Sequence, residues 1–127
     1  MTISRRVFFL TTAAAVAATV VALALPANAQ QASHFLDNGL ALSGYDPVAY
    51  FTVGKAVEGS AEFEAAWQGV SWRFSSEDNK QAFLSEPKRY APQYGGYCAY
   101  AVSQGYTASA DPQAWSIVDD KLYVNFN

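Results

Sequence analysis

Soft-metal binding and thiol chemistry in this chain depend on Cys98 and His34, because the sequence contains one cysteine and one histidine. A thiolate and an imidazole both bind zinc or copper, but a closed metal site needs three or four protein ligands. Cys98 and His34 are therefore the candidate metal ligands. We expect them to hold a soft metal such as copper only where a second chain, an oxygen ligand or an external ligand completes the site.

Groups suited to catalysis are sparse. A Ser-His-Asp triad would have to use His34. Glu62 and Glu64 are two residues apart on a predicted strand and share the face opposite Phe63, which favours solvated side chains over acid–base work. We predict no catalytic residue and expect that the chain is not an enzyme.

Two interpretations of Cys98 stay open. In the first, Gly95-Gly96 presents Cys98 at the start of a helix, where backbone N–H groups and the helix dipole favour a reactive thiolate. In the second, Cys98 is an inert core thiol, since free cysteine is among the most often buried residue types. With no second cysteine, no intramolecular disulfide can form, and a redox protein would lack its resolving thiol.

Tyrosines occur around Cys98 at helix-like intervals. Such a stripe would suit an aromatic cage for a cofactor such as haem, and the candidate cofactor-binding residues are Tyr94, Tyr97, Cys98 and Tyr100. Because Pro92 and two glycines interrupt the stripe, core aromatics with their hydroxyls at the surface are the simpler explanation.

The N-terminus has the pattern of an export signal. Residues 1–29 combine Arg5 and Arg6, an alanine-rich apolar run and Ala27-Asn28-Ala29, a typical cleavage site. The paired arginines before an apolar run resemble the twin-arginine motif, with ordinary Sec export as the alternative. We predict a periplasmic protein that has no membrane segment after cleavage.

Residues 30–127 then suffice for one small domain. The formal net charge is −3, and loss of Arg5 and Arg6 makes the exported chain more negative. An acidic chain without a basic patch is not suited to nucleic acid. We expect an unknown protein or a small ligand as the partner.

The first half predicts a flexible tail, a helix and a hairpin. Residues 30–39 read as the tail. Asp46-Pro47 has the cap and first-turn order of a short helix that reaches Phe51. Apolar alternation on both sides of Gln68-Gly69 predicts a hairpin over residues 63–74.

The second half predicts a helix beginning at Ser75 or Ser76 and ended by Pro87, with Glu77 and Asp78 in its first turn. A closing hairpin should turn at Asp119-Asp120. The predicted fold class is α+β, a small antiparallel sheet built from hairpins with short helices packed on it, and Trp72 and Trp115 belong to its core.

Two motifs carry a family resemblance. SGYDPVAYF at residues 43–51 and WRFSSEDNKQAFLSEPKRYAPQYGGYC at residues 72–98 resemble the YHS domain family, over about residues 40–127. The resemblance implies a part found beside metal-handling and oxygenase machinery. Family members run on into a helical tail, so we expect a domain truncated at its C-terminus, where an exposed edge would favour self-association.

The chain departs from the cysteine-bearing members of that family. In those members a cysteine follows Asp-Pro-Val and two more lie around a strand-to-helix turn. The corresponding residues here are Ala49, Ser75 and Asn79, none of which supplies a thiolate. The resemblance therefore implies that the metal site of those members is missing.

These observations predict a non-catalytic, exported YHS-type binding or accessory module with an unknown ligand. The alternative is a small thiol-dependent redox protein, or a soft-metal or haem-handling protein, that uses Cys98.

Overall fold

The computed structural model describes residues 32–126, so the predicted signal peptide at residues 1–29 lies outside the described residues. None of the helices in the described part has the length and apolar composition needed to cross a membrane.

The described chain starts with a small hairpin. Strands β1 (Leu36–Asp37) and β2 (Leu40–Ala41) pair across Asn38-Gly39, which have φ angles of 55° and 77°. Asparagine and glycine tolerate this left-handed conformation best, which is why they favour two-residue hairpin turns. A 3-10 turn, η2 (Leu42–Gly44), then leads to helix α1 (Ala49–Thr52).

The predicted central hairpin is present as β3 (Ser60–Trp67) and β4 (Val70–Phe74). The four-stranded sheet has the order β1-β2-β4-β3. It is mixed rather than wholly antiparallel, because β2 joins β4 in parallel through Leu40 and Ser71. The sequence indicated hairpins, whose strands are antiparallel; it gave no sign that the two-residue β2 would add to the free edge of β4.

The predicted helix is α2 (Glu77–Ser85), and Ser76 caps it by accepting a hydrogen bond from the Asn79 backbone N–H at 3.1 Å. Three short elements follow, α3 (Pro87–Tyr90), η3 (Gln93–Gly96) and α4 (Ala99–Ser103). The closing hairpin consists of β5 (Asp111–Val118) and β6 (Lys121–Asn125). The α+β class is thus confirmed.

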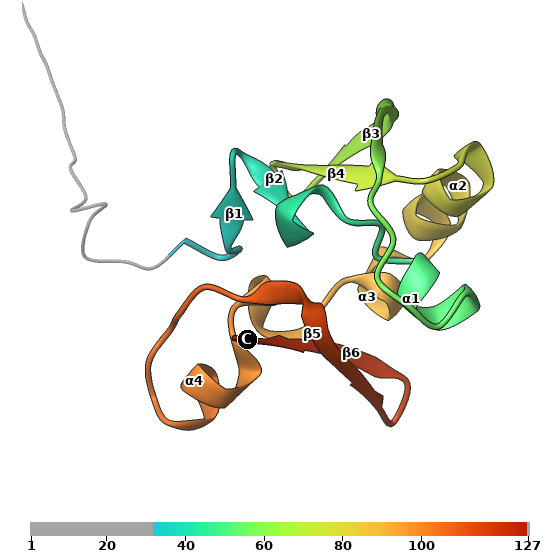
Figure 1. The fold of residues 1–127 in the computed structure, drawn as a ribbon. Coiled ribbons are helices and arrows are strands. Elements are labelled where there is room, and N and C mark those ends of the chain that lie inside the picture. The colour runs from blue at the N-terminus through green and yellow to red at the C-terminus, as the bar shows by residue number, and fades with distance from the viewer. Residues whose placement is uncertain (1–31, 127) are drawn as a thin grey trace, which may run out of the picture. The chain divides into compact units, whose positions relative to one another are not determined.

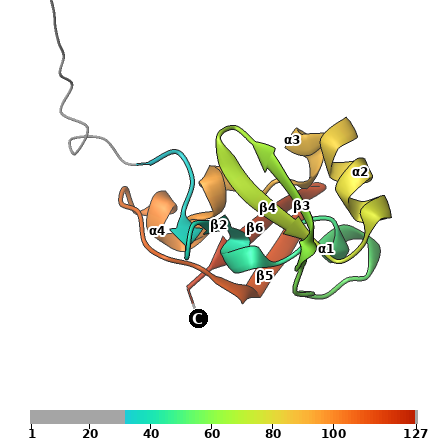
Figure 2. The same cartoon turned by 90° about the horizontal axis from the view of Figure 1, so that it is seen from above.

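The core lies between the four-stranded sheet and the closing hairpin, which Figures 1 and 2 show on opposite sides of it. Trp72 and Phe74 come from β4, Phe83 from α2, and Leu122 and Val124 from β6; each is at most 1% exposed. Trp115 is partly buried against this cluster, with its ring 5.2 Å from that of Tyr50. Aromatic burial on this scale supplies the apolar area that a small domain needs.

Part of the predicted flexible tail lies against the domain. The backbone N–H of Phe35 donates to the Gly95 carbonyl at 3.0 Å, and the Tyr97 hydroxyl donates to the Ala32 carbonyl at 2.9 Å. His34 lies in the same segment and is only 6% exposed. One backbone acceptor of η3 and the Tyr97 hydroxyl thus hold the segment from Ala32 to Phe35 against the domain.

Candidate functional site

Asp46 is fully buried and is the centre of a cluster of hydrogen bonds. Its Oδ1 accepts hydrogen bonds from the backbone N–H groups of Val48 at 2.8 Å and Ala49 at 3.3 Å. These two bonds cap the first turn leading into α1, as the Asp46-Pro47 order predicted.

Its second oxygen was not foreseen to have a role. Oδ2 accepts from the backbone N–H of Ser75 at 2.8 Å, the Ser75 hydroxyl at 2.6 Å and the Asn79 side-chain amide at 2.8 Å. A buried carboxylate with this many donors holds together the turn before α1 and the start of α2.

This cluster brings together the three residues that differ from the cysteine-bearing pattern. The backbone N–H of Ala49 donates to Oδ1 of Asp46, whereas the Ser75 hydroxyl and the Asn79 side-chain amide donate to Oδ2, so two distant parts of the sequence meet at one carboxylate. The proximity of the three positions agrees with a metal site in members that carry cysteines there. In this chain the same space holds a hydrogen-bonded structural cluster.

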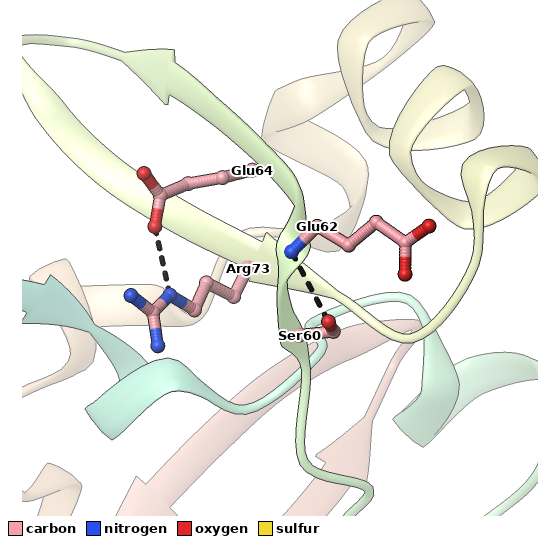
Figure 3. A network of polar contacts seen from close by, with 4 residues as sticks. All are labelled: Ser60, Glu62, Glu64 and Arg73. Atoms are coloured by element: carbon pink, nitrogen blue, oxygen red, sulfur yellow. Dashed lines mark hydrogen bonds and ion pairs between the residues drawn. The ribbon is translucent and has the colours of Figure 1, made fainter.

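The acidic pair on β3 does not form a site. Glu64 pairs with Arg73 on β4, with Oε2 2.7 Å from Nε, whereas the Glu62 side chain points away from that pair (Figure 3). The backbone N–H of Glu62 donates to the Ser60 hydroxyl at 3.1 Å. Glu62 and Glu64 are both exposed on either side of the partly buried Phe63, in agreement with the solvated side chains that the alternation predicts. A register shift between Ser60 and Glu64 makes the strand irregular there.

The candidate cofactor-binding tyrosines have separate surroundings. Tyr94 is half exposed and its ring lies 5.9 Å from that of Tyr123, whereas the Tyr97 ring packs 5.9 Å from Phe35. Tyr100 is 63% exposed. The structure brings no two of the three candidate tyrosine rings into contact within residues 32–126, so the helix-like stripe does not become a cage.

Cys98 directly precedes α4, as predicted, but it is 3% exposed. Its Sγ lies 4.0 Å from Oδ1 of Asn125 on β6, and that same oxygen accepts a 3.0 Å hydrogen bond from the backbone N–H of Tyr100. The side chain of Asn125 therefore caps α4. This N–H is not available to stabilise a thiolate, and the burial favours the core interpretation.

His34 contributes to a second kind of site. Its ring lies edge-on to the rings of Trp67 at 6.1 Å and Trp72 at 5.8 Å, and its Nδ1 is 3.1 Å from the Ser33 hydroxyl oxygen. Burial lowers the pKa of His34 below its ordinary value of 6.5, which favours the neutral imidazole at neutral pH.

A pocket of about 390 Å³ lies beside this imidazole, and we call it the His34 pocket. Trp67, Ala91 and Pro92 form apolar parts of its wall, and Lys88 and His34 are among its polar residues. The volume is within the range of small-molecule sites, which combine an apolar wall with a few polar groups.

Gly95 allows the tail to close this pocket. Its φ is +65°, and a Cβ atom there would lie 2.0 Å from the Ser33 carbonyl oxygen. A residue with a side chain would push Ser33 and His34 away. Gly95 thus positions the tail, a role that the sequence did not reveal.

Sequence reasoning placed His34 in a mobile tail and gave Lys88 no role. The available signals were weak: an aromatic tail residue at Phe35, and two glycines where one is enough for a turn. Neither indicates which segment packs on the glycines. The two metal candidates also have different environments, since His34 lines the pocket and Cys98 is buried beside β6.

A second hollow, of about 510 Å³, is lined by the acidic residues Asp37, Glu58 and Asp111 together with Tyr45 and Phe126. No group of three or more histidine, cysteine or acidic residues in the described chain is arranged to hold a metal ion.

The comparisons with known proteins agree with the two motifs. The family model described as YHS domain matches residues 48–94, which run from the turn before α1 to η3. No curated protein matches the chain. No solved structure matches it either. The matched range includes Ala49, Ser75 and Asn79 of the Asp46 cluster, and Trp67 and Lys88 of the His34 pocket. The match shows that this chain contains a YHS domain.

Proposed function

We propose that the chain is a non-catalytic, exported binding module whose ligand occupies the His34 pocket. One observation carries the proposal: a buried imidazole and an exposed ammonium group, from His34 and Lys88, line the same small and partly apolar cavity. Polar groups that converge on an apolar cavity are typical of ligand sites.

The other chemistry-bearing groups support a module rather than an enzyme. Asp46 uses both carboxylate oxygens in structural hydrogen bonds. Glu64 is paired with Arg73 at the surface, where it is partly exposed. The imidazole of His34 is oriented by Ser33 and two tryptophans, which is an arrangement for holding a ring in place.

The alternative, thiol chemistry at Cys98, has one observation in its favour, namely its position at the start of α4. Burial to 3% exposure and the Asn125 cap oppose it. The two functions make different predictions for the reactivity of the thiol.

Export is part of the proposal and rests on residues 1–29. If the twin-arginine pathway is used, replacing Arg5 and Arg6 together by lysine should block the appearance of mature protein in the periplasm. A Sec substrate would still be exported after this change, because that pathway needs only positive charge before the apolar run. Mature periplasmic protein from the double variant would therefore exclude the twin-arginine route.

Ligand binding is tested by native mass spectrometry of protein isolated from the periplasm, with metal analysis of the same sample. We expect a small-molecule adduct that is released on denaturation. The matched variant is Gln93→Trp, which places a large ring in the wall of the His34 pocket and should remove the adduct. An adduct that persists in Gln93→Trp would place the ligand elsewhere.

A further inference from the structure

The His34 pocket has a positive charge in a negatively charged chain. Lys88 is the charged side chain in its wall, and no aspartate or glutamate lines it. The whole sequence has eleven acidic and eight basic residues, giving a formal net charge of −3. A cation at an apolar cavity attracts negatively charged ligands more strongly than one in open solvent.

Lys88 is available for such a ligand. It belongs to α3 and is exposed, and the ion pairs of the described residues, Arg73 with Glu64 and Arg89 with Glu86, do not include it. Its neighbour Arg89 is held by Glu86 at 3.5 Å, so the two adjacent cations differ in their surroundings.

The second recognition group is Nε2 of His34. Nδ1 interacts with the Ser33 hydroxyl, and no residue of the described chain forms a hydrogen bond with Nε2. When Ser33 donates to Nδ1, the neutral ring carries its proton on Nε2, which is then a buried donor without a protein partner. Buried polar groups are nearly always satisfied by protein, water or a ligand, so in this tautomer Nε2–H is free to donate to an acceptor that enters the pocket.

The rest of the wall limits the ligand. Trp67, Ala91 and Pro92 present apolar surface, which a bare inorganic ion would leave unused. A volume of about 390 Å³ corresponds to roughly a dozen water molecules at about 30 Å³ each, which restricts the ligand to a small molecule.

We infer that the His34 pocket selects a small organic carboxylate, whose negative group is held by the Lys88 ammonium and His34 Nε2–H while its apolar body contacts Trp67 and Pro92. This inference rests on the proposed function, because it names the class of ligand for the same pocket. Charge-assisted hydrogen bonds to the carboxylate are stronger than those to a neutral analogue, so they supply the selectivity.

The experiment uses the mature protein and the imidazole C–H signals of His34, which are unambiguous in NMR spectra because the chain has one histidine. The probes are benzoate, the neutral benzamide and the cationic benzamidine, which share size and shape, together with inorganic phosphate. We expect saturable shifts with benzoate, about tenfold weaker binding of benzamide, and no shift with benzamidine; tenfold corresponds to about 1.4 kcal/mol.

The matched variants are Lys88→Gln and Lys55→Gln, both at exposed lysines, of which Lys55 is outside the pocket wall. Lys88→Gln should reduce benzoate affinity to that of benzamide, and Lys55→Gln should leave it unchanged. Equal binding of benzoate and benzamide by the wild type would contradict selectivity for an anion, but it would still support the pocket as a ligand site. Phosphate binding as tight as that of benzoate would contradict the claim that the ligand has an organic, apolar part. Failure of every probe to shift His34 would contradict the pocket as a ligand site, and with it the proposed function.

Discussion

Oδ2 of Asp46 lies 2.6 Å from the hydroxyl oxygen of Ser75, although 29 residues separate them in the sequence. The contact joins the turn before α1 to the end of β4, and Asn79 extends it into α2. It also removes from solvent an oxygen that could otherwise interact with a ligand. The cluster therefore explains both the stability of this region and its lack of open coordination positions.

Asp46→Asn should be strongly destabilising. The substitution leaves one acceptor oxygen and replaces the other by an amide N–H₂. This group would face either the donor from Val48 or the donors from Ser75 and Asn79, and the side chain stays fully buried. Hydrogen bonds to charged groups contribute about 1.5–3 kcal/mol each, so we expect a loss of about 3 kcal/mol or more in the free energy of unfolding.

Urea denaturation followed by tryptophan fluorescence measures this loss. The matched control is Asp78→Asn, an exposed carboxylate in the first turn of α2, which should lose only about 0.3–1 kcal/mol from the helix dipole interaction. Similar losses in the two variants would show that the buried cluster contributes little.

The reduced wild-type monomer should bind zinc or copper(I) no more tightly than micromolar. Ala49, Ser75 and Asn79 supply no thiolate, and the Asp46 oxygens near them already accept hydrogen bonds. Competition with a chromophoric chelator measures the affinity. A variant with cysteine at all three positions is the positive control, because three adjacent thiolates provide a soft-ligand set. Nanomolar binding by one wild-type chain would contradict this prediction and would require metal ligands other than Cys98 and His34.

Local chemistry explains why most elements were predictable. The turns at Gln68-Gly69 and Asp119-Asp120 have left-handed φ angles of 54°, 77°, 53° and 63°, and the sequence placed both hairpins at these residues. Capping by Ser76 and the break at Pro87 follow from side chain and ring geometry over a few residues.

The features that the sequence did not predict depend on contacts between distant segments. The parallel pairing of Leu40 with Ser71, the burial of His34 and the second set of bonds to Asp46 each join residues far apart in the sequence. Periodicity and capping rules describe near neighbours, so they identify Asp46 as a cap but cannot identify Ser75 as its partner. The pocket was not predicted for the same reason, although His34 and Tyr94, which line it, were among the sequence candidates.

Gly95→Ala should release the segment from Ala32 to Phe35. The new Cβ would lie 2.0 Å from the Ser33 carbonyl oxygen, and the φ of +65° adds strain for alanine. His34 would become hydrated, so its pKa should rise toward 6.5, as measured by NMR titration. Gly54→Ala is the control, because its φ of +78° imposes similar strain while no atom lies within 4 Å of the new Cβ. An unchanged His34 pKa in Gly95→Ala would show that the tail is held by other contacts.

His34 should make stability depend on pH in one direction. Burial lowers its pKa in the folded state, so the unfolded state binds more protons below pH 6.5. Its contribution is therefore complete above about pH 6.5 and is lost as the pH falls from there toward the folded-state pKa. The difference in unfolding free energy between wild type and His34→Gln should be constant above pH 7 and decrease in acid. A difference that grows as the pH falls would have the wrong sign and would mean that the protonated imidazole is stabilised.

Cys98 should react slowly with iodoacetamide in the folded protein. Its side chain is 3% exposed, and the backbone N–H of Tyr100, the donor available to a thiolate at the start of α4, donates to Asn125 Oδ1 instead. Reaction then requires local opening, so we expect the native rate to be roughly a hundredfold below the rate in denaturant.

Cys98→Ala should lower the free energy of unfolding by about 1 kcal/mol, since a small buried group is removed. Cys98→Ser should cost about 1–3 kcal/mol, because it buries a hydroxyl whose nearest acceptor, Asn125 Oδ1, already lies 4.0 Å from the longer-reaching Sγ.

The same variants distinguish the module from the redox protein. If Cys98 is structural, Cys98→Ala retains the small-molecule adduct of the wild type and changes only stability. Asn125→Ala provides a second comparison, because it removes the acceptor that occupies the Tyr100 N–H without touching the thiol. If the Asn125 cap prevents the Cys98 thiolate from forming, alkylation of Cys98 should be faster in Asn125→Ala. If burial alone makes the thiol unreactive, alkylation should stay slow. Alkylation of the native wild-type protein at the rate seen in denaturant would overturn the structural role and would favour thiol chemistry at Cys98.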